Sequence, residues 1–167
     1  MIKFLLKIFP LLLWLPLFSQ DCQYEKNEID ETTLLPVKRT TFVSLCKVNR
    51  SPFECKAHSI GNNKYLKIRY YRYNDFYIPA DQPLIFIMED SSGISLTAIQ
   101  PRRDSTNLSS MMTVSSLLVY ELSEETFEML TSQPVIMIRY YQDNEYISVE
   151  VKDKSRLLLK QILDCIR

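Results

Sequence analysis

The chain has 167 residues, of which 46% are hydrophobic, and it carries 20 basic and 20 acidic side chains. A chain of this length and apolar content can bury a substantial core, so the composition excludes intrinsic disorder and favours one domain. The balanced charge lacks the excess of basic residues that nucleic acids and anionic membrane surfaces attract. We therefore expect no nucleic-acid partner, and nothing in the charge suggests an electrostatic membrane anchor.

The first residues have the pattern of a secretory signal peptide. Lys3 and Lys7 make a positive start, the apolar run 8–18 follows, and Ser19 is a small residue at the exit. The run is shorter than the roughly 20 residues that cross a bilayer, and no later segment is long and apolar enough to do so. We expect a signal peptide over 1–19 and a mature chain that is periplasmic or secreted. Because both lysines leave, 18 of the 20 basic side chains remain against 20 acidic ones.

Four cysteines stay in the mature chain: Cys22, Cys46, Cys55 and Cys165. An even number in an exported chain favours disulfides, although four cysteines allow three connectivities. A turn-like stretch, 48–52, separates Cys46 from Cys55, which favours a local bridge, and Cys22 and Cys165 would then join the two ends of the mature chain. Two alternatives stay open: some or all of the thiols are reduced and buried, or Cys22 carries a lipid.

The mature chain is expected to start with an extended, polar lead-in over 20–36. A single globular domain follows over 37–167. From there on, short runs rich in β-branched and aromatic residues alternate with period two, which is typical of strands. The first strand is predicted over 37–48. A hairpin with strands over 64–73 and 76–79 follows it.

The C-terminal half contains further strands and two helices. Strands are predicted over 84–88, 94–99, 111–122, 135–141 and 146–151, and the last two form a second hairpin. The segment 101–110 has the composition of a loop. Ser123 is placed to cap a short helix that has Phe127 and Leu130 on its inner face. A last helix begins at Asp153, and its apolar residues recur on one face.

These elements predict a mainly β, β-rich α+β fold. About eight short strands favour an antiparallel β-sandwich or open barrel, with a short helix and a packed C-terminal helix. The chain has only two glycines, Gly61 and Gly93. Turn positions that need a positive φ are therefore expected at Asn and Asp.

The sequence offers little of the chemistry of an enzyme. It has too few glycines for a phosphate-binding loop, and it lacks a Gly-x-Ser-x-Gly nucleophile motif. Cys46, Cys55 and His58 would give zinc only three ligands, and His58, the single histidine, is expected to be an ordinary residue beside a strand end. The carboxylate pairs Glu89-Asp90 and Glu124-Glu125 suit a strand end and a helix N-terminus. We expect no catalytic residue, no metal and no cofactor.

The Arg- and Tyr-rich segment 67–77 is the candidate binding surface. Alternation places Lys67, Arg69, Tyr71 and Tyr73 on one face. Arg and Tyr anchor protein interfaces, and tyrosine rings also stack on sugars. Our hypothetical binding residues are therefore Arg69, Tyr71 and Tyr73. The alternative is a ladder of aromatic and cation–π pairs that only stabilises the sheet.

Both ends of the chain carry short motifs. They are Cys22-x-Tyr24 with Asn27-Glu28-Ile29-Asp30-Glu31 at the start, then Leu122-Ser123-Glu124-Glu125, Val135-x-x-Ile138-Arg139 and Asp164-Cys165-Ile166. In these motifs the chain resembles small exported proteins of the Bacteroidetes group that have no assigned activity. The resemblance implies a Gram-negative envelope location and transfers no functional residue.

These observations favour a non-enzymatic, monomeric module of the bacterial envelope that binds a protein or a glycan. An alternative is an accessory or inhibitor protein for an envelope enzyme, with the loop 101–110 entering the active site of that enzyme. A third alternative is a hydrolase that uses carboxylates.

Overall fold

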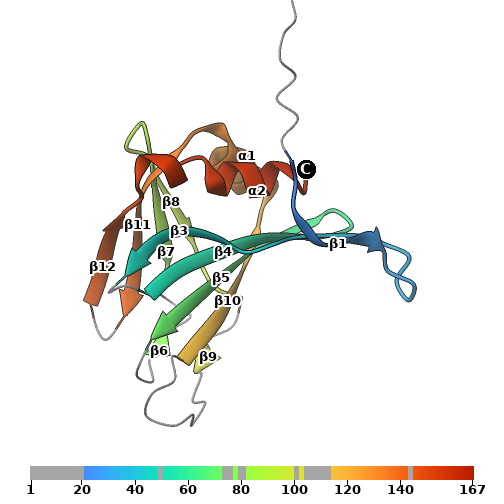
Figure 1. Cartoon of the computed structure of the whole chain (residues 1–167), viewed down its shortest axis with the longest axis horizontal. Helices are drawn as coiled ribbons and strands as arrows, with labels where there is room; N and C mark the ends of the chain where they lie inside the picture. The colour runs from blue at the N-terminus through green and yellow to red at the C-terminus, as the bar shows by residue number, and fades with distance from the viewer. Residues whose placement is uncertain are drawn as a thin grey trace, which may run out of the picture.

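The computed structural model of the chain describes residues 21–48, 51–72, 77–78, 82–99, 102–103, 114–142 and 145–167. The predicted signal peptide and most of the predicted loop 101–110 lie outside these ranges. Two antiparallel sheets enclose the core, and helices lie at one end of it (Figure 1). The predicted β-rich α+β class is confirmed. Among the described residues no helix is both long and apolar enough to cross a membrane.

The first sheet has six strands. In spatial order they are β1 (Tyr24–Ile29), β2 (Pro36–Thr40), β4 (Ser51–Ile60), β5 (Asn63–Arg72) and β10 (Val114–Leu122), and β3 (Val43–Val48) also pairs with β4. The second sheet has the order β12 (Glu145–Glu150), β11 (Val135–Gln142), β7 (Leu84–Met88) and β8 (Gly93–Leu96). A small ladder joins β6 (Tyr77–Ile78) to β9 (Arg102–Arg103). The helical elements are α1 (Glu124–Ser132), the 3-10 turn η1 (Asp153–Ser155) and α2 (Leu158–Asp164).

The two sheets meet at two seams, and aromatic and aliphatic side chains fill the space between them. At one seam an isolated bridge pairs Ala98 with Tyr120. At the other seam β12 lies beside β3. Phe53 of the first sheet contacts Tyr140 of the second, with ring centroids 5.6 Å apart. Each inner face is apolar because every second residue of the strands points inward.

The C-terminal half follows the sequence prediction closely. The strand over 84–88, the hairpin of β11 and β12, and the short helix are all present. Ser123 caps that helix, since its Oγ accepts a hydrogen bond from the Thr126 N–H at 3.1 Å. Phe127 and Leu130 are fully buried. The last helix starts as η1 at Asp153 and continues as α2.

The first predicted hairpin is wrong. β5 pairs with β4 on one side and β10 on the other, and β6 pairs with β9. Leu66 and Ile68 of β5 are completely buried, so this strand needs a long neighbour on each side, which the two residues of β6 cannot provide. The predicted turn, Asn74-Asp75, lies outside the described residues.

The predicted lead-in and first strand also differ from the structure. The lead-in contains β1, a strand with polar residues on both faces because it lies at the sheet edge. The predicted strand 37–48 is divided into β2 and β3, which both pair with β4. Arg39 lies opposite His58 and Val43 opposite Cys55, so the chain has one extra residue between them and bulges at 41–42.

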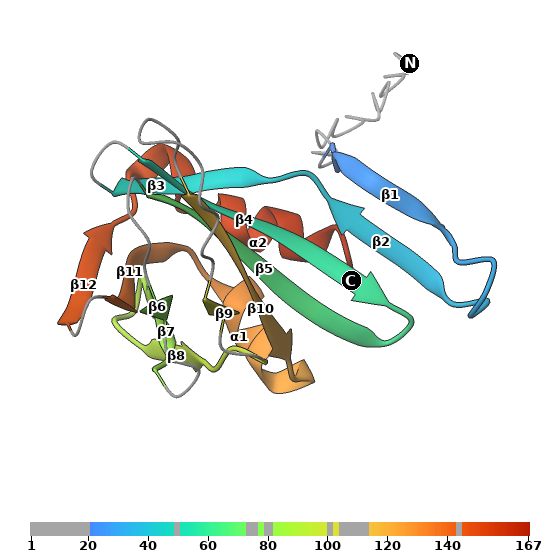
Figure 2. The same ribbon diagram turned by 90° about the horizontal axis from the view of Figure 1, so that it is seen from below.

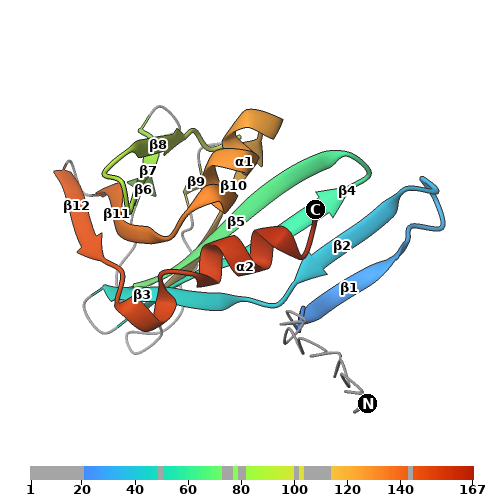
Figure 3. The same ribbon diagram turned by 90° about the horizontal axis from the view of Figure 1, so that it is seen from above.

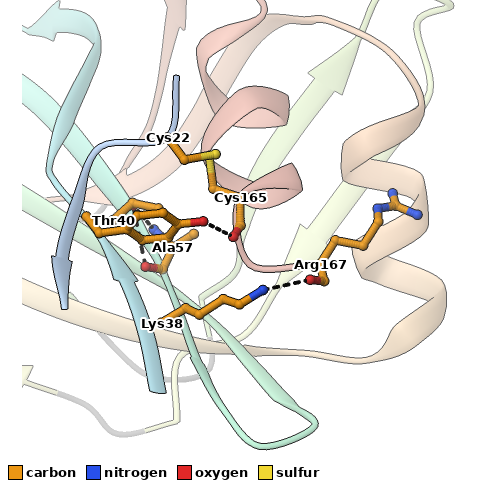
Figure 4. The surroundings of a disulfide bond; sticks show 7 residues. Cys22, Lys38, Thr40, Ala57, Cys165 and Arg167 are labelled. Carbon is orange, nitrogen blue, oxygen red and sulfur yellow. Dashed lines mark hydrogen bonds between the residues drawn. A yellow bond between two sulfur atoms is a disulfide. The ribbon is translucent and has the colours of Figure 1, made fainter. Parts of the chain in front are cut away.

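The hairpin of β1 and β2, residues 24–40, is called the arm here. It extends beyond the rest of the first sheet in Figures 2 and 3. Its base is joined to the end of α2 by a disulfide between Cys22 and Cys165 (Figure 4). Tyr24 Oη donates to the Cys165 carbonyl oxygen at 2.7 Å, and Lys38 Nζ donates to the Arg167 main-chain oxygen at 3.1 Å. Three contacts thus fix the arm to the C-terminal segment.

Cys46 and Cys55 are free, buried thiols, so the predicted local bridge does not form. A bulge after Ser44 changes the register and places Cys46 opposite Phe53 and Cys55 opposite Val43. The two cysteines are thus not direct cross-strand partners. Burial raises the pKa of Cys46 to about 12, which keeps this thiol protonated and unreactive.

We expect loss of the terminal disulfide to destabilise the fold. It closes a loop with a sequence separation of 143 residues, and loop entropy alone gives about 5 kcal/mol for a loop of this order. A Cys22→Ser/Cys165→Ser variant should unfold at lower urea concentration than the wild type, while Cys46→Ala should keep the disulfide. An intact mass that does not rise by two hydrogens on reduction would contradict the bridge.

Candidate functional site

Arg69, the first of the predicted binding residues, is held by its own neighbours. Its Nε and Nη2 donate to Glu54 Oε2 at 2.9 and 2.7 Å. The guanidinium carbon lies 3.8 Å from the centroid of the Phe42 ring. The side chain of Tyr71, and Tyr73 altogether, lie outside the described residues. The described contacts of Arg69 are those of a residue that stabilises the sheet.

Arg69 belongs to a charged surface on the outer side of β2, β4 and β5, which is called the cationic face here. Its members share the outward positions of three neighbouring strands and are Arg39, Glu54, Lys56, His58, Tyr65, Lys67 and Arg69. In register, His58 lies between Arg39 and Tyr65, Lys56 opposite Lys67, and Glu54 opposite Arg69. In Figure 2, β4 and β5 are seen in front of α2, with β2 beside them.

Two cations of this face are paired with acids. Glu54 holds Arg69, and Glu25, from β1, lies 2.6 Å from Lys56 Nζ. The Phe42 ring also lies beneath Lys56 Nζ, 4.3 Å from the ring centroid. Phe42 reaches both cations from the bulge at 41–42. These contacts neutralise one end of the cationic face.

The other end of the face carries cations without acidic partners in the part of the chain that is described. Arg39 and Lys67 have no ion pair there, and Arg39 Nε is buried without a hydrogen bond. His58 lies between them, is 5% exposed, and makes no hydrogen bond through either ring nitrogen. Burial, together with Lys67, Arg39 and Lys56, lowers the pKa of His58 to about 4, whereas Glu25 acts in the opposite direction. His58 is therefore neutral at pH 7.

The expectation of an ordinary histidine at a strand end does not describe this environment. His58 lies inside β4, and its cationic neighbours come from β2 and β5 as well as β4. The sequence signal was the alternation of Lys56 with His58 and of Lys67 with Arg69. Alternation shows that these residues share faces of their own strands, but not that the two strands and β2 lie side by side.

The tip of the arm is a second distinctive surface. Ile29, Leu34 and Leu35 are 64, 76 and 43% exposed there, and these three residues are called the apolar tip. The turn beneath them is ordered by Asp30, whose Oδ1 accepts hydrogen bonds from Thr32 N at 3.1 Å and Thr33 N at 2.9 Å. Hydrogen bonds from Thr33 and Thr32 lower the pKa of Asp30, so its carboxylate stays charged.

Leu34 adopts φ +57°, in the left-handed region. Together with Ser91 and Gly61 it makes up the positive-φ residues of the described chain, so the prediction that Asn and Asp take these positions is wrong for the turns that can be seen. No sequence rule predicts an exposed leucine in this conformation.

The carboxylate pairs have local structural roles. Asp90 Oδ1 accepts from Ser92 N at 2.8 Å, and hydrogen bonds from Ser92 and Gln133 lower the pKa of Asp90. Glu124 Oε2 lies 2.6 Å from Lys64 Nζ, at the start of α1. Within the described ranges no group of three or more His, Cys, Asp or Glu side chains could hold a metal ion.

A groove of about 500 Å³ lies between β2, the β4–β5 turn and the C-terminal residues. It is lined by Lys38, Gly61, Lys64 and Arg167, among others. Lys64 is already paired with Glu124, and Arg167 Nη1 lies 2.9 Å from Glu128 Oε1. Lys38 Nζ donates to the Arg167 main-chain oxygen, so each of the three cations of this groove already has an acceptor within the chain.

We expect Arg69→Ala to destabilise the protein by about 1–3 kcal/mol, because it leaves the half-buried Glu54 carboxylate without its donors. Arg69→Lys, which keeps the charge but loses the two-donor geometry, should cost less. Urea unfolding of both variants measures the difference. Unchanged stability of Arg69→Ala would instead leave this residue available for binding, as the sequence suggested.

We also expect the stability to depend on pH through His58. Its pKa is lower in the folded than in the unfolded state, so the unfolded chain binds the proton first as the pH falls. The contribution of His58 to the free energy of unfolding is complete above about pH 6.5. As the pH falls from there to about 4, the free energy of unfolding decreases by on the order of 3 kcal/mol. Urea unfolding at several pH values gives the free energy of unfolding as a function of pH. This free energy should change less steeply with pH in His58→Gln than in the wild type. Equal slopes would mean that the histidine titrates normally in the folded state.

Comparisons of the chain with models of protein families, with curated proteins and with solved structures find no match. No family or activity passes to the chain by similarity, and its function must be inferred from its own surfaces.

Proposed function

We propose that this chain is a non-enzymatic binding module of the bacterial envelope and that its apolar tip inserts into another protein. The observation that carries the proposal is the state of Leu34, which is 76% exposed at φ +57°. A non-glycine residue in the left-handed region costs roughly 1–2 kcal/mol, and the exposed side chain gains no burial. Folding alone would favour Asn or Gly here, so the leucine points to a role outside the fold.

The arm is ordered before any partner binds. Asp30 N–H donates to the Leu35 carbonyl oxygen at 2.9 Å, and Leu34 N–H donates to the Asp30 carbonyl oxygen at 2.8 Å. With the side-chain bonds of Asp30 these close the turn, and the disulfide holds the other end of the arm. A preordered tip loses less conformational entropy on binding, which supports a role in recognition.

The chemistry of the tip favours a protein over a glycan as the partner. The apolar tip consists of aliphatic side chains, whereas sugar rings stack on aromatic ones. Behind the tip, β1 is polar, with Lys26 and Glu28 joined by a salt bridge of 2.9 Å. An aliphatic tip on a polar stem fits a narrow apolar pocket with a polar rim.

Export is a second part of the proposal. Its support is the signal-peptide pattern of residues 1–19 and the disulfide between Cys22 and Cys165, a bond that persists in oxidising compartments. The projecting arm also favours the accessory or inhibitor alternative, because a protruding hairpin can enter the cleft of an envelope enzyme. The predicted loop 101–110 does not carry that alternative, since most of it lies outside the described residues.

We expect Leu34→Asn to abolish partner binding without destabilising the protein, because asparagine tolerates the left-handed region better than leucine. The measurement is crosslinked capture from the native envelope, with untreated and protease-treated extracts, followed by a thermal melt of each variant. Met129→Gln, which removes an exposed apolar side chain from α1, is the matched control and should keep binding.

Binding that survives Leu34→Asn would contradict the role of the tip. If the captured partner survives protease treatment, the partner is a glycan and not a protein.

A further inference from the structure

We propose that the unpaired end of the cationic face is a binding site for an oxyanion, formed by Arg39 of β2, His58 of β4 and Lys67 of β5. The oxyanion is a phosphate, sulfate or carboxylate group of a ligand. His58 lies directly opposite Arg39 of β2, and Lys67 of β5 is a diagonal neighbour of His58, two register positions from Tyr65, which pairs with His58 directly. None of them belongs to the apolar tip, so this site goes beyond the proposed function.

The charge balance of the face is the first observation. Each acid that reaches it already has its own cation, Glu25 with Lys56 and Glu54 with Arg69. Arg39 and Lys67 are left without an acid among the described residues, at positions where water screens them incompletely. Desolvation, and then repulsion from Arg39 and Lys56, lowers the pKa of Lys67, whereas Glu25 acts in the opposite direction. An added anion would remove this repulsion.

The buried nitrogens are the second observation. Buried polar side-chain atoms nearly always have a hydrogen-bond partner, so each exception requires an explanation such as an ion or a water molecule. Three exceptions occur here on two neighbouring side chains, Arg39 Nε and both ring nitrogens of His58. They are the only such atoms that the structure shows in its described ranges. Their coincidence with the uncompensated cations marks one site.

The donor set suits an oxyanion. A guanidinium presents a planar fork of N–H donors, and an ammonium adds a compact charge beside it. Phosphate, sulfate and carboxylate oxygens accept such charge-assisted bonds. Arg39 and Lys67 are half-buried and His58 is buried, so an anion would approach this end of the face from the solvent side.

The groups that face His58 come from four strands. They are Glu25 of β1, Arg39 of β2, Lys56 of β4, and Tyr65 and Lys67 of β5. Only Glu25 is an acid, and it is bound to Lys56. An oxyanion would add negative charge beside the ring and stabilise its protonated form.

Because His58 is the single histidine, its ring protons give an isolated NMR signal that reports its pKa directly. The purified protein is titrated in sodium chloride and, at equal ionic strength, in sodium sulfate, phosphate or acetate. We expect a pKa near 4 in chloride and a rise of at least one unit in one or more of the oxyanions. By linkage, that oxyanion binds the protonated form at least tenfold more tightly than the neutral form. The salts that produce the rise identify which oxyanion the site prefers.

Arg39→Gln and Lys67→Gln should each remove most of the difference between oxyanion and chloride, and Lys47→Gln, an exposed cation on β3, should keep it. Near-UV circular dichroism confirms that each variant is folded at each pH. Equal titration curves in all four salts would overturn the proposal. The proposal would also be overturned if Lys47→Gln lost as much of the difference in His58 pKa between oxyanion and chloride as the Arg39 and Lys67 variants do. That result would mean that the anions screen the charge of the protein in general and do not bind at this site. The Leu34→Asn variant should respond as the wild type, so this test and the test of the apolar tip fail independently.

Discussion

The disulfide between Cys22 and Cys165 is the constraint on which the arm depends. In the described chain β1 pairs only with β2, and an isolated two-stranded hairpin is marginally stable in water. The disulfide fixes the start of β1 to the end of α2, and the hydrogen bond from Tyr24 strengthens this joint. Since α2 packs on α1 and the first sheet, the arm has a rigid base and can hold its tip away from the core.

The inner and outer faces of the first sheet follow different physical rules. Along β4, Phe53, Cys55 and Ala57 are buried in the core, while the residues between them carry charge. The core is stabilised by apolar burial and needs no partner outside the chain. The outer face is stabilised by two acid–cation pairs and by the Phe42 ring, and in the described chain neither acid is paired with Arg39 or Lys67. Both proposed surfaces thus lie where a residue costs stability that no contact within the described chain offsets. At the tip this residue is the exposed leucine, and on the face it is the buried nitrogens without a hydrogen bond.

Sequence reasoning succeeded where structure is set locally. The strand over 84–88, the hairpin of β11 and β12 and the cap at Ser123 each depend on nearby residues. It failed where a strand's partner is distant in sequence: β5 was assigned to β6, but its buried Leu66 and Ile68 require β4 and β10. The polar β1 was missed because an edge strand outside the core shows no apolar alternation. Arg69 lies among the outward residues as predicted, yet its partners come from elsewhere: Glu54 from β4, and Phe42 from the bulge between β2 and β3.

By itself, the sequence determined the β-rich class, the alternation of charged and apolar residues on the strands, and the low content of catalytic motifs. These properties depend on composition and short-range periodicity, which are visible in the linear chain. The predicted pairing of Cys22 with Cys165 is confirmed, but only the tertiary structure decided that Cys46 and Cys55 stay unbridged. It also decided that the polar lead-in becomes a projecting arm and that Arg39, His58 and Lys67 share one surface. The physical reason is that strand pairing brings together residues distant in sequence, and no local pattern specifies which strands become neighbours.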